Sequence, residues 1–225
     1  MKVNADFSER VLVHGANLPW VPSPMAGVER RMLDRIGEEV ARATSLVRYA
    51  PGSHFEAHVH GGGEEFLVLE GVFHDEHGDY PVGTYVRNPP TSRHTPGAED
   101  GCIIFVKLRQ FEPTDRTFVR APSARMHGIQ SAERAGACIT PLYEDERERV
   151  QLERWDPGVT VCFDAPGGAE LLVLEGELVE SGDELRRWSW LRVPTGGQID
   201  AKAGKDGCSV WIKTGHLRFI GAASA

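Results

Sequence analysis

Two halves of this 225-residue chain repeat the same series of short apolar segments, and this duplication constrains the fold more than any other feature. Residues 65–71 read Glu-Phe-Leu-Val-Leu-Glu-Gly, and residues 170–176 read Glu-Leu-Leu-Val-Leu-Glu-Gly. Residues 100–107 and 206–213 then match in the same order. Because the matches are collinear and about a hundred residues apart, we infer duplication of one unit and not a solenoid of shorter repeats.

Each half has the sequence pattern of an antiparallel β-structure. Its apolar runs are short, rich in Val, Ile, Leu and Phe, and separated by Gly, Pro, Asp or Asn at intervals of about ten residues. Residues 26–36 also fit an amphipathic helix, because four apolar side chains lie at helical spacing. The counterpart at residues 137–143 lacks that spacing and contains Pro141, so strands are favoured. The sequence therefore predicts an all-β fold, with an antiparallel sandwich or barrel in each half.

Composition narrows the classes of partner and compartment. The formal net charge of −8 gives no basic surface for nucleic acid or anionic lipid. We expect a cytoplasmic protein, because the charged N-terminus does not resemble a signal peptide and no apolar stretch is long enough to cross a membrane. The four cysteines form no Cys-x-x-Cys pair, and we expect mostly small buried side chains at these positions: Cys102, Cys138, Cys162 and Cys208.

Three histidines and one glutamate form the candidate functional site. His58 and His60 lie two residues apart, so on a strand both point to one face. The glycines at 61–63 allow a chain reversal, which brings Glu64 back toward these histidines. His94 follows thirty residues later, behind a turn that contains two prolines. We predict that the four side chains bind one divalent transition metal ion per chain, since imidazole and carboxylate suit Zn, Fe(II), Mn and Ni alike.

These segments resemble the two conserved motifs of the cupin superfamily. The sequence His-Val-His-Gly-Gly-Gly-Glu-Glu-Phe-Leu-Val-Leu-Glu-Gly at 58–71, together with Arg-Asn-Pro-Pro-Thr-Ser-Arg-His-Thr-Pro at 87–96, is similar to ChrR-like cupins. That family includes the cupin domain of the anti-sigma factor ChrR and is related to dioxygenases acting on acetylacetone and hydroxyacetophenones. The resemblance implies an all-β bicupin, made of two jelly-roll β-barrels, whose metal ligands are His58, His60, Glu64 and His94. The second motif departs from its usual form, with Thr91 in place of glycine and Ala98 in place of asparagine.

The second half aligns with the first but lacks the ligands. Its positions corresponding to the four ligands hold no histidine or carboxylate: Phe163, Ala165, Ala169 and Gln198. We therefore expect residues 1–112 to form a metal-binding cupin unit, 113–130 a linker, and 131–225 a degenerate cupin unit that supports the first or forms a dimer surface.

Several further side chains are candidates for positions around the metal. His54 is four residues before His58, so on a strand it points to the same face. It either supports the ligands without binding the metal or lies on the rim of the barrel. Tyr85, Arg87 and Phe105 are candidates to line the cavity, although packing roles are the simpler reading of each. His74 and His77 lie in a loop rich in Asp and Gly and are expected to be solvated. No catalytic residue beyond the metal centre is assigned.

Two functions fit this pattern. One is an Fe(II)-dependent dioxygenase of a small diketone or related substrate bound in the N-terminal barrel. The other is a zinc-binding regulatory or stress-sensing cupin in sigma-factor control, in which four ligands close a tetrahedral site. The chain has no His-x-x-x-Cys-x-x-Cys pattern of the ChrR anti-sigma domain, so we do not expect direct sigma-factor inhibition. A second copy of the chain is a candidate partner, as a homodimer.

Overall fold

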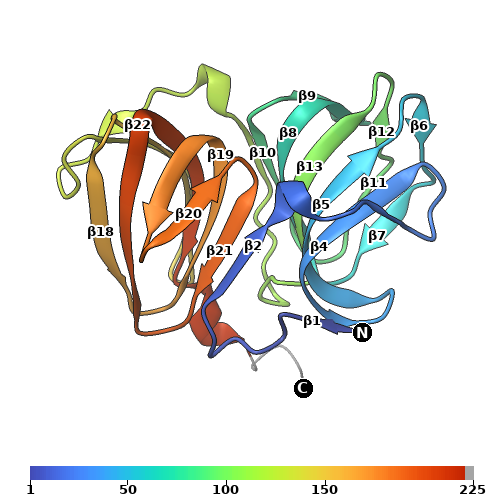
Figure 1. The fold of residues 1–225 in the computed structure, drawn as a ribbon. Coiled ribbons are helices and arrows are strands. Elements are labelled where there is room, and N and C mark those ends of the chain that lie inside the picture. Colours follow the sequence, from blue (N-terminus) through green and yellow to red (C-terminus); the bar gives the residue numbers. More distant parts are fainter. Residues whose placement is uncertain (221–225) are drawn as a thin grey trace. The chain divides into compact units, whose positions relative to one another are not determined.

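The computed structural model describes residues 1–220, which form 22 β-strands and three short 3-10 helices (Figure 1). No α-helix occurs in this described part, and the all-β prediction is confirmed. None of its helices has the length and apolar character required to cross a membrane. The described chain divides into two compact units, one formed by residues 1–5 and 18–126, the other by residues 6–17 and the chain from 127 onward.

The first unit contains thirteen of the strands. They are β1 (Lys2–Val3), β3 (Val21–Pro22), β4 (Val28–Gly37), β5 (Ala41–Tyr49), β6 (Ser53–His54), β7 (His58–His60), β8 (Glu64–Asp75), β9 (Gly78–Pro81), β10 (Thr84–Asn88), β11 (Ser92–His94), β12 (Gly97–Ala98), β13 (Cys102–Leu108) and β14 (Val119–Pro122), followed by the 3-10 helix η2 (Ser123–Arg125). The main sheet has the order β1-β4-β5-β13-β8-β10-β14, while β7 and β11 form a separate two-stranded sheet.

The second unit repeats this arrangement. It contains β2 (Val11–His14), η1 (Gly15–Asn17), β15 (Ile129–Gln130), β16 (Ala137–Glu144), β17 (Arg149–Trp155), β18 (Thr160–Ala165), β19 (Ala169–Glu180), β20 (Asp183–Arg186), β21 (Ser189–Val193), β22 (Gly197–Thr214) and η3 (His216–Phe219). Six strands of its sheet order, β16-β17-β22-β19-β21-β2, correspond to β4-β5-β13-β8-β10-β14 of the first unit, and β15 pairs with the start of β16 as β3 pairs with the start of β4. The predicted duplication of one antiparallel jelly-roll unit is therefore confirmed.

The two repeats exchange their first strands. In sequence β2 lies between the two segments of the first unit, but it pairs with β21 of the second unit, beside which it lies in Figure 1. β14, in the segment expected to be a linker, pairs with β10 of the first unit. The first repeat thus supplies β2 to the second unit, and the start of the second repeat supplies β14 to the first unit.

In the segment for which a helix competed, 26–36, residues 28–36 lie in β4 and form a strand, as favoured from the sequence. Its pairing with β5 shifts register between Met32 and Asp34, so Leu33 is the extra residue of a β-bulge. The bulge interrupts the alternation of a regular strand. This explains why the apolar residues of this segment are not spaced two apart.

Each unit has its own apolar core. In the first unit the core consists of inward-facing residues of its strands: Val28, Val47, Phe66, Val68, Phe73, Tyr80, Val86, Ala98, Cys102, Ile104 and Val106. The Phe73 ring of this core also lies near the His94 ring, with centroids 5.9 Å apart. The candidate ligands therefore lie at the border of the apolar core.

Candidate metal centre

The β7–β8 turn and strand β11 bring the predicted ligands together. β7 pairs with β11 so that His58 lies directly opposite His94. The chain then reverses at Gly63, whose φ of 76° favours glycine. A Cβ atom there would lie 2.5 Å from the Phe111 ring, so the turn requires glycine for space as well. Glu64 follows as the first residue of β8.

Three of the four side chains converge on one point. One ligand nitrogen from each of His58, His60 and His94 lies within 4.8 Å of the other two. The Nε2 atoms of His60 and His94 are 2.9 Å apart. The Oε2 atom of Glu64 lies 3.5 Å from the first of these nitrogens and 3.7 Å from the second. The three imidazoles thus form a candidate metal-binding group, and the Glu64 carboxylate lies beside two of them.

The outer nitrogens of two imidazoles have hydrogen-bond acceptors. The Nδ1 atom of His94 lies 3.3 Å from Oδ2 of Asp75, and Nδ1 of His58 lies 3.2 Å from the Glu56 carbonyl oxygen. Because both partners can only accept, each Nδ1 carries a proton, and in the neutral ring Nε2 keeps its lone pair. That tautomer is the one a metal-binding histidine needs.

Asp75 is itself held in place. Its Oδ1 accepts hydrogen bonds of 2.8 Å from the Tyr80 hydroxyl and from the His77 backbone N–H. Burial alone would lower the pKa of His94, but the hydrogen bond to Asp75 and the negative charge of Glu64 outweigh burial and raise it. The Asp75 carboxylate therefore orients the His94 ring and contributes to its raised pKa.

Glu64 is buried yet stays ionised. Burial alone would raise the pKa of Glu64, but His60, His94 and a 3.1 Å hydrogen bond from the Asn88 side chain outweigh burial and lower it. Burial, with the positive charge of the neighbouring histidines, lowers the pKa of His60. A charged carboxylate beside a neutral imidazole is the donor pair that divalent transition metals bind.

The histidines of the centre are largely withdrawn from solvent. The side chains of His60 and His94 are 8% and 3% exposed, and His58 is half-buried.

The structure places the other candidate residues elsewhere. Tyr85, Arg87 and Phe105 lie on the opposite face of their strands from core residues such as Val86, because side chains alternate along a strand. Tyr85 donates to Glu65, and Arg87 pairs with Asp115, so both are engaged away from the histidines. The ring of His54 pairs with Glu99 and does not contact the centre. Packing is thus the role that these positions support.

Three supporting residues were not predicted from the sequence. Asp75 lies within the loop expected to be solvated, Asn88 was seen only as part of a turn, and Arg120 lies in the expected linker. The Arg120 guanidinium donates to Asn88 Oδ1 at 2.7 Å and to the Tyr80 hydroxyl at 3.1 Å. It therefore braces the partners of both Glu64 and His94. Of these three residues, only Asn88 could have been found from the sequence, because it lies just before the two prolines of the turn that leads to His94.

In the second unit an apolar core replaces the ligands. Phe163 lies opposite Ile199 in the β18–β22 pairing, as His58 lies opposite His94, so Ile199 and not Gln198 is the true counterpart of His94. Ala165, Ala169 and Ile199 are buried in that core, and Phe163 packs against it. In the described part of this unit, no three His, Cys, Asp or Glu side chains have ligand atoms close enough to hold a metal.

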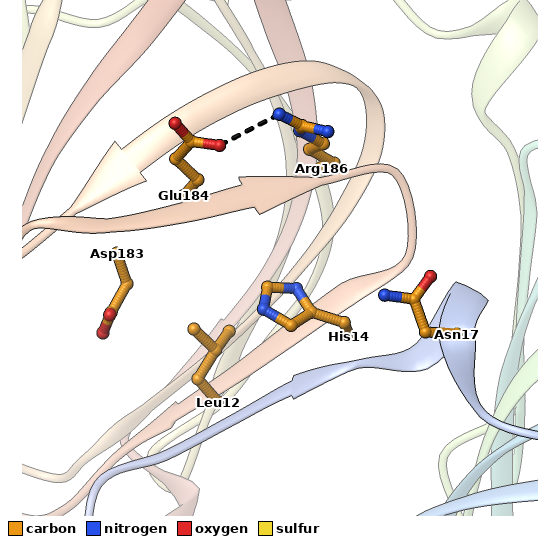
Figure 2. Close-up of a pocket in the computed structure, with 6 residues that line it drawn as sticks. All are labelled: Leu12, His14, Asn17, Asp183, Glu184 and Arg186. Carbon is orange, nitrogen blue, oxygen red and sulfur yellow. Dashed lines mark hydrogen bonds and ion pairs between the residues drawn. The ribbon is translucent and has the colours of Figure 1, made fainter.

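The second unit also has a surface hollow of about 310 Å³, shown in Figure 2. Its lining comes from β2 and η1 on one side and β20 on the other: Leu12, His14, Asn17, Asp183, Glu184 and Arg186. Arg186 is paired with Glu184 at 3.0 Å, and both side chains are 71% exposed. The hollow shares no residue with the counterpart of the metal centre.

The cysteines add no reactive group to the site. All four are free, and Cys102 and Cys208 are buried. Burial raises the pKa of each of these two thiols to about 12, which keeps them protonated.

Comparison with solved structures identifies the fold. A protein from Nostoc punctiforme PCC 73102 described as a proposed dioxygenase superposes with a TM-score of 0.78 at 13% identity, covering 95% of this chain and 85% of that one. The bacterial pirin YhhW from Escherichia coli, in complex with nickel(II), superposes with a TM-score of 0.66 at 13% identity, covering 92% of this chain and 99% of that one. An oxalate decarboxylase from Bacillus subtilis superposes with a TM-score of 0.65 at 12% identity, covering 91% of this chain and 76% of that one. No curated protein sequence matches this chain.

Fold and site together define a duplicated cupin protein with a candidate metal centre. More specifically, the family model of the ChrR cupin-like domain matches residues 8–112. The resemblance seen in the sequence is thereby confirmed, and the match covers the repeat that carries the histidines.

Proposed function

We propose that this protein is a mononuclear metal-dependent enzyme of the dioxygenase type that acts on a small diketone or a related organic substrate. The observation that carries the proposal is the make-up of the centre: three imidazoles meet at the border of an apolar core, with the Glu64 carboxylate beside two of them. A catalytic metal site keeps a coordination position open for substrate, and three histidine ligands leave such a position.

We assign His58, His60, Glu64 and His94 as the metal ligands. A divalent ion there would supply Lewis-acid chemistry and, as iron, redox chemistry. The chain's own residues prepare the centre: Asp75 keeps the proton on Nδ1 of His94, and Asn88 holds the Glu64 carboxylate. Carbon–carbon cleavage with incorporation of both atoms of O₂ needs no external reductant, because the substrate itself is oxidised.

The same proposal gives the second unit a supporting role without this centre, and it places the protein in the cytoplasm. The partner is then a small molecule and not a nucleic acid. The four apolar counterparts of the ligands in the second core support this division of labour.

Reconstitution with Fe(II) tests the enzyme proposal. The metal-free protein is loaded with Fe(II) or Zn²⁺, and oxygen uptake is measured with a panel of β-diketones. We expect uptake with Fe(II) that is lost in His60→Ala, while His77→Ala, whose ring lies outside the centre, keeps it. Tight binding of Zn²⁺ with no oxygen uptake by the Fe(II) form on any diketone would sink the dioxygenase proposal.

A zinc-dependent regulatory role is the second candidate. Its support is the four-ligand count, which equals the coordination of a closed tetrahedral zinc site. In that case zinc removal should change the thermal stability and conformation of the protein but no turnover should accompany any metal. The same panel of metal-loaded samples, followed by thermal unfolding, separates the two candidates.

A further inference from the structure

A second group of metal-ligand side chains lies at the far end of strand β8. Glu64 of the centre is the first residue of this strand, and His74 is its next-to-last residue. His54, His74 and Glu99 each offer one ligand atom, and these three atoms lie within 4.8 Å of one another. No residue of this group belongs to the centre described above.

The backbone explains why two distant histidines meet here. The short strand β12 pairs with β6 on one side and with β8 on the other, and Gly97 is the partner of both His54 and His74. The three residues therefore occupy one rung across three strands, where side chains point to the same face. Gly97 has no side chain, so the two imidazoles approach above it, with ring centroids 5.7 Å apart.

The fit at Gly97 is close. A Cβ atom on this glycine would lie 2.2 Å from Nε2 of His74, so the imidazole occupies the space that any other residue would fill. His74 is thus held over the middle strand by local packing, and it does not extend freely into solvent, as the loop composition had suggested.

The chemistry of the group suits a divalent transition metal. Nε2 of His54 lies 3.0 Å from Oε1 of Glu99, so the carboxylate already faces one imidazole. Within residues 1–220 the His74 ring has no hydrogen-bond partner. The side chains of His54 and Glu99 are 59% and 70% exposed, so water can complete the coordination. Two imidazoles, one carboxylate and water form a common ligand set for zinc.

We propose that His54, His74 and Glu99 form a peripheral binding site for a divalent transition metal, separate from the centre at His58, His60 and His94. Metal bound there joins β6, the end of β12 and the end of β8. His74 directly precedes Asp75, whose carboxylate orients His94, so the peripheral ion restrains the strand end that supports the centre. The chain then binds two ions, one more than the single ion predicted from the sequence.

Zinc titration of the metal-free full-length protein, followed with a competing chromophoric chelator, tests this site. We expect two equivalents of Zn²⁺ per chain in the wild type and one in the double variant His54→Ala/His74→Ala. His77→Ala is the matched control, because this histidine lies on the same hairpin outside both groups, and it should keep two. The proposal is overturned if the double variant binds as many equivalents as the wild type.

A second pair of variants separates this proposal from the function of the main centre. His60→Ala/His94→Ala should lose the other equivalent and keep the peripheral one, whichever metal the main centre uses. Gly97→Ala should displace His74 and remove only the peripheral equivalent, with circular dichroism confirming that the fold is retained. Zinc binding that survives in Gly97→Ala at wild-type stoichiometry would contradict the geometry described here.

Discussion

Thr91 has a backbone conformation that favours glycine. Its φ is 72°, and its N–H donates to the His60 carbonyl oxygen at 2.9 Å. In the second unit Gly196 has a φ of 77° and makes the equivalent bond to Ala165. A β-branched residue in this conformation is strained, yet the turn it closes leads directly to His94.

Thr91→Gly should therefore stabilise the protein. Relief of the left-handed conformation is worth about 1 to 2 kcal/mol, and the greater freedom of glycine in the unfolded chain offsets part of it, leaving a gain of about 1 kcal/mol. Denaturant unfolding measures the change. Thr95→Gly, also exposed but at an ordinary φ, should lower stability, and a loss of stability in Thr91→Gly would show that the strain is absent.

We expect Asp75 to contribute to metal binding without contacting the metal. Because its carboxylate accepts from Nδ1 of His94, Asp75→Asn should leave this ring less well oriented and lower the affinity of the centre for Zn²⁺ about 10- to 100-fold. A competition titration with a chelator measures the change. Asp79→Asn, at an exposed aspartate on the neighbouring strand, should have no effect. Equal Zn²⁺ affinities in the two variants would show that Asp75 does not contribute to metal binding.

Strand β14 supports the centre from a segment that the sequence predicts to be a linker. Arg120 donates to Asn88 and to Tyr80, and these donate in turn to Glu64 and Asp75. One guanidinium thus holds two chains of hydrogen bonds, which lead to the proposed ligands Glu64 and, through Asp75, His94. Removing it leaves buried acceptors without a partner.

Arg120→Ala should accordingly lower zinc affinity about tenfold, less than the loss of a direct partner, and it should also lower thermal stability. Isothermal titration with a competing chelator and thermal unfolding give the two readings. Arg125→Ala, an exposed arginine just beyond the same strand, serves as the control. Unchanged affinity in Arg120→Ala would mean that Asn88 and Tyr80 are held without it.

At this scale the sequence predicted some elements and missed others for physical reasons. The β7 turn and the start of β8 follow from period-two spacing and three glycines, which act locally. β14 has no comparable signal, because its proline-containing surroundings read as a linker and only pairing with β10 makes it a strand. Asp75 looks solvated in sequence, since its partners Tyr80 and His94 are brought near by tertiary structure.

Over the whole molecule, the repeats seen in sequence and the compact units seen in space do not coincide. β2 belongs to the first repeat and completes the second unit, while β14 does the reverse. A self-alignment of the sequence cannot detect such an exchange, because equivalent strands occupy equivalent places. It also misaligned one ligand position by a residue, since the turn near Thr91 and Gly196 lacks apolar residues to fix the register.

The strand exchange predicts that a destabilising substitution in the exchanged strand of one repeat destabilises the compact unit formed mainly by the other repeat. Ala121 is buried in β14, and Leu12 of β2 packs against the core of the second unit. Burying a carboxylate at either position should cost a few kcal/mol. Ala121→Asp should therefore speed amide hydrogen exchange in β8 and weaken zinc binding, although residue 121 lies outside the matched domain. Leu12→Asp, inside that domain, should speed exchange in β19 and spare zinc binding. If Leu12→Asp were instead the variant that lost zinc, the first repeat alone would form the metal-binding unit and the strand exchange would be refuted.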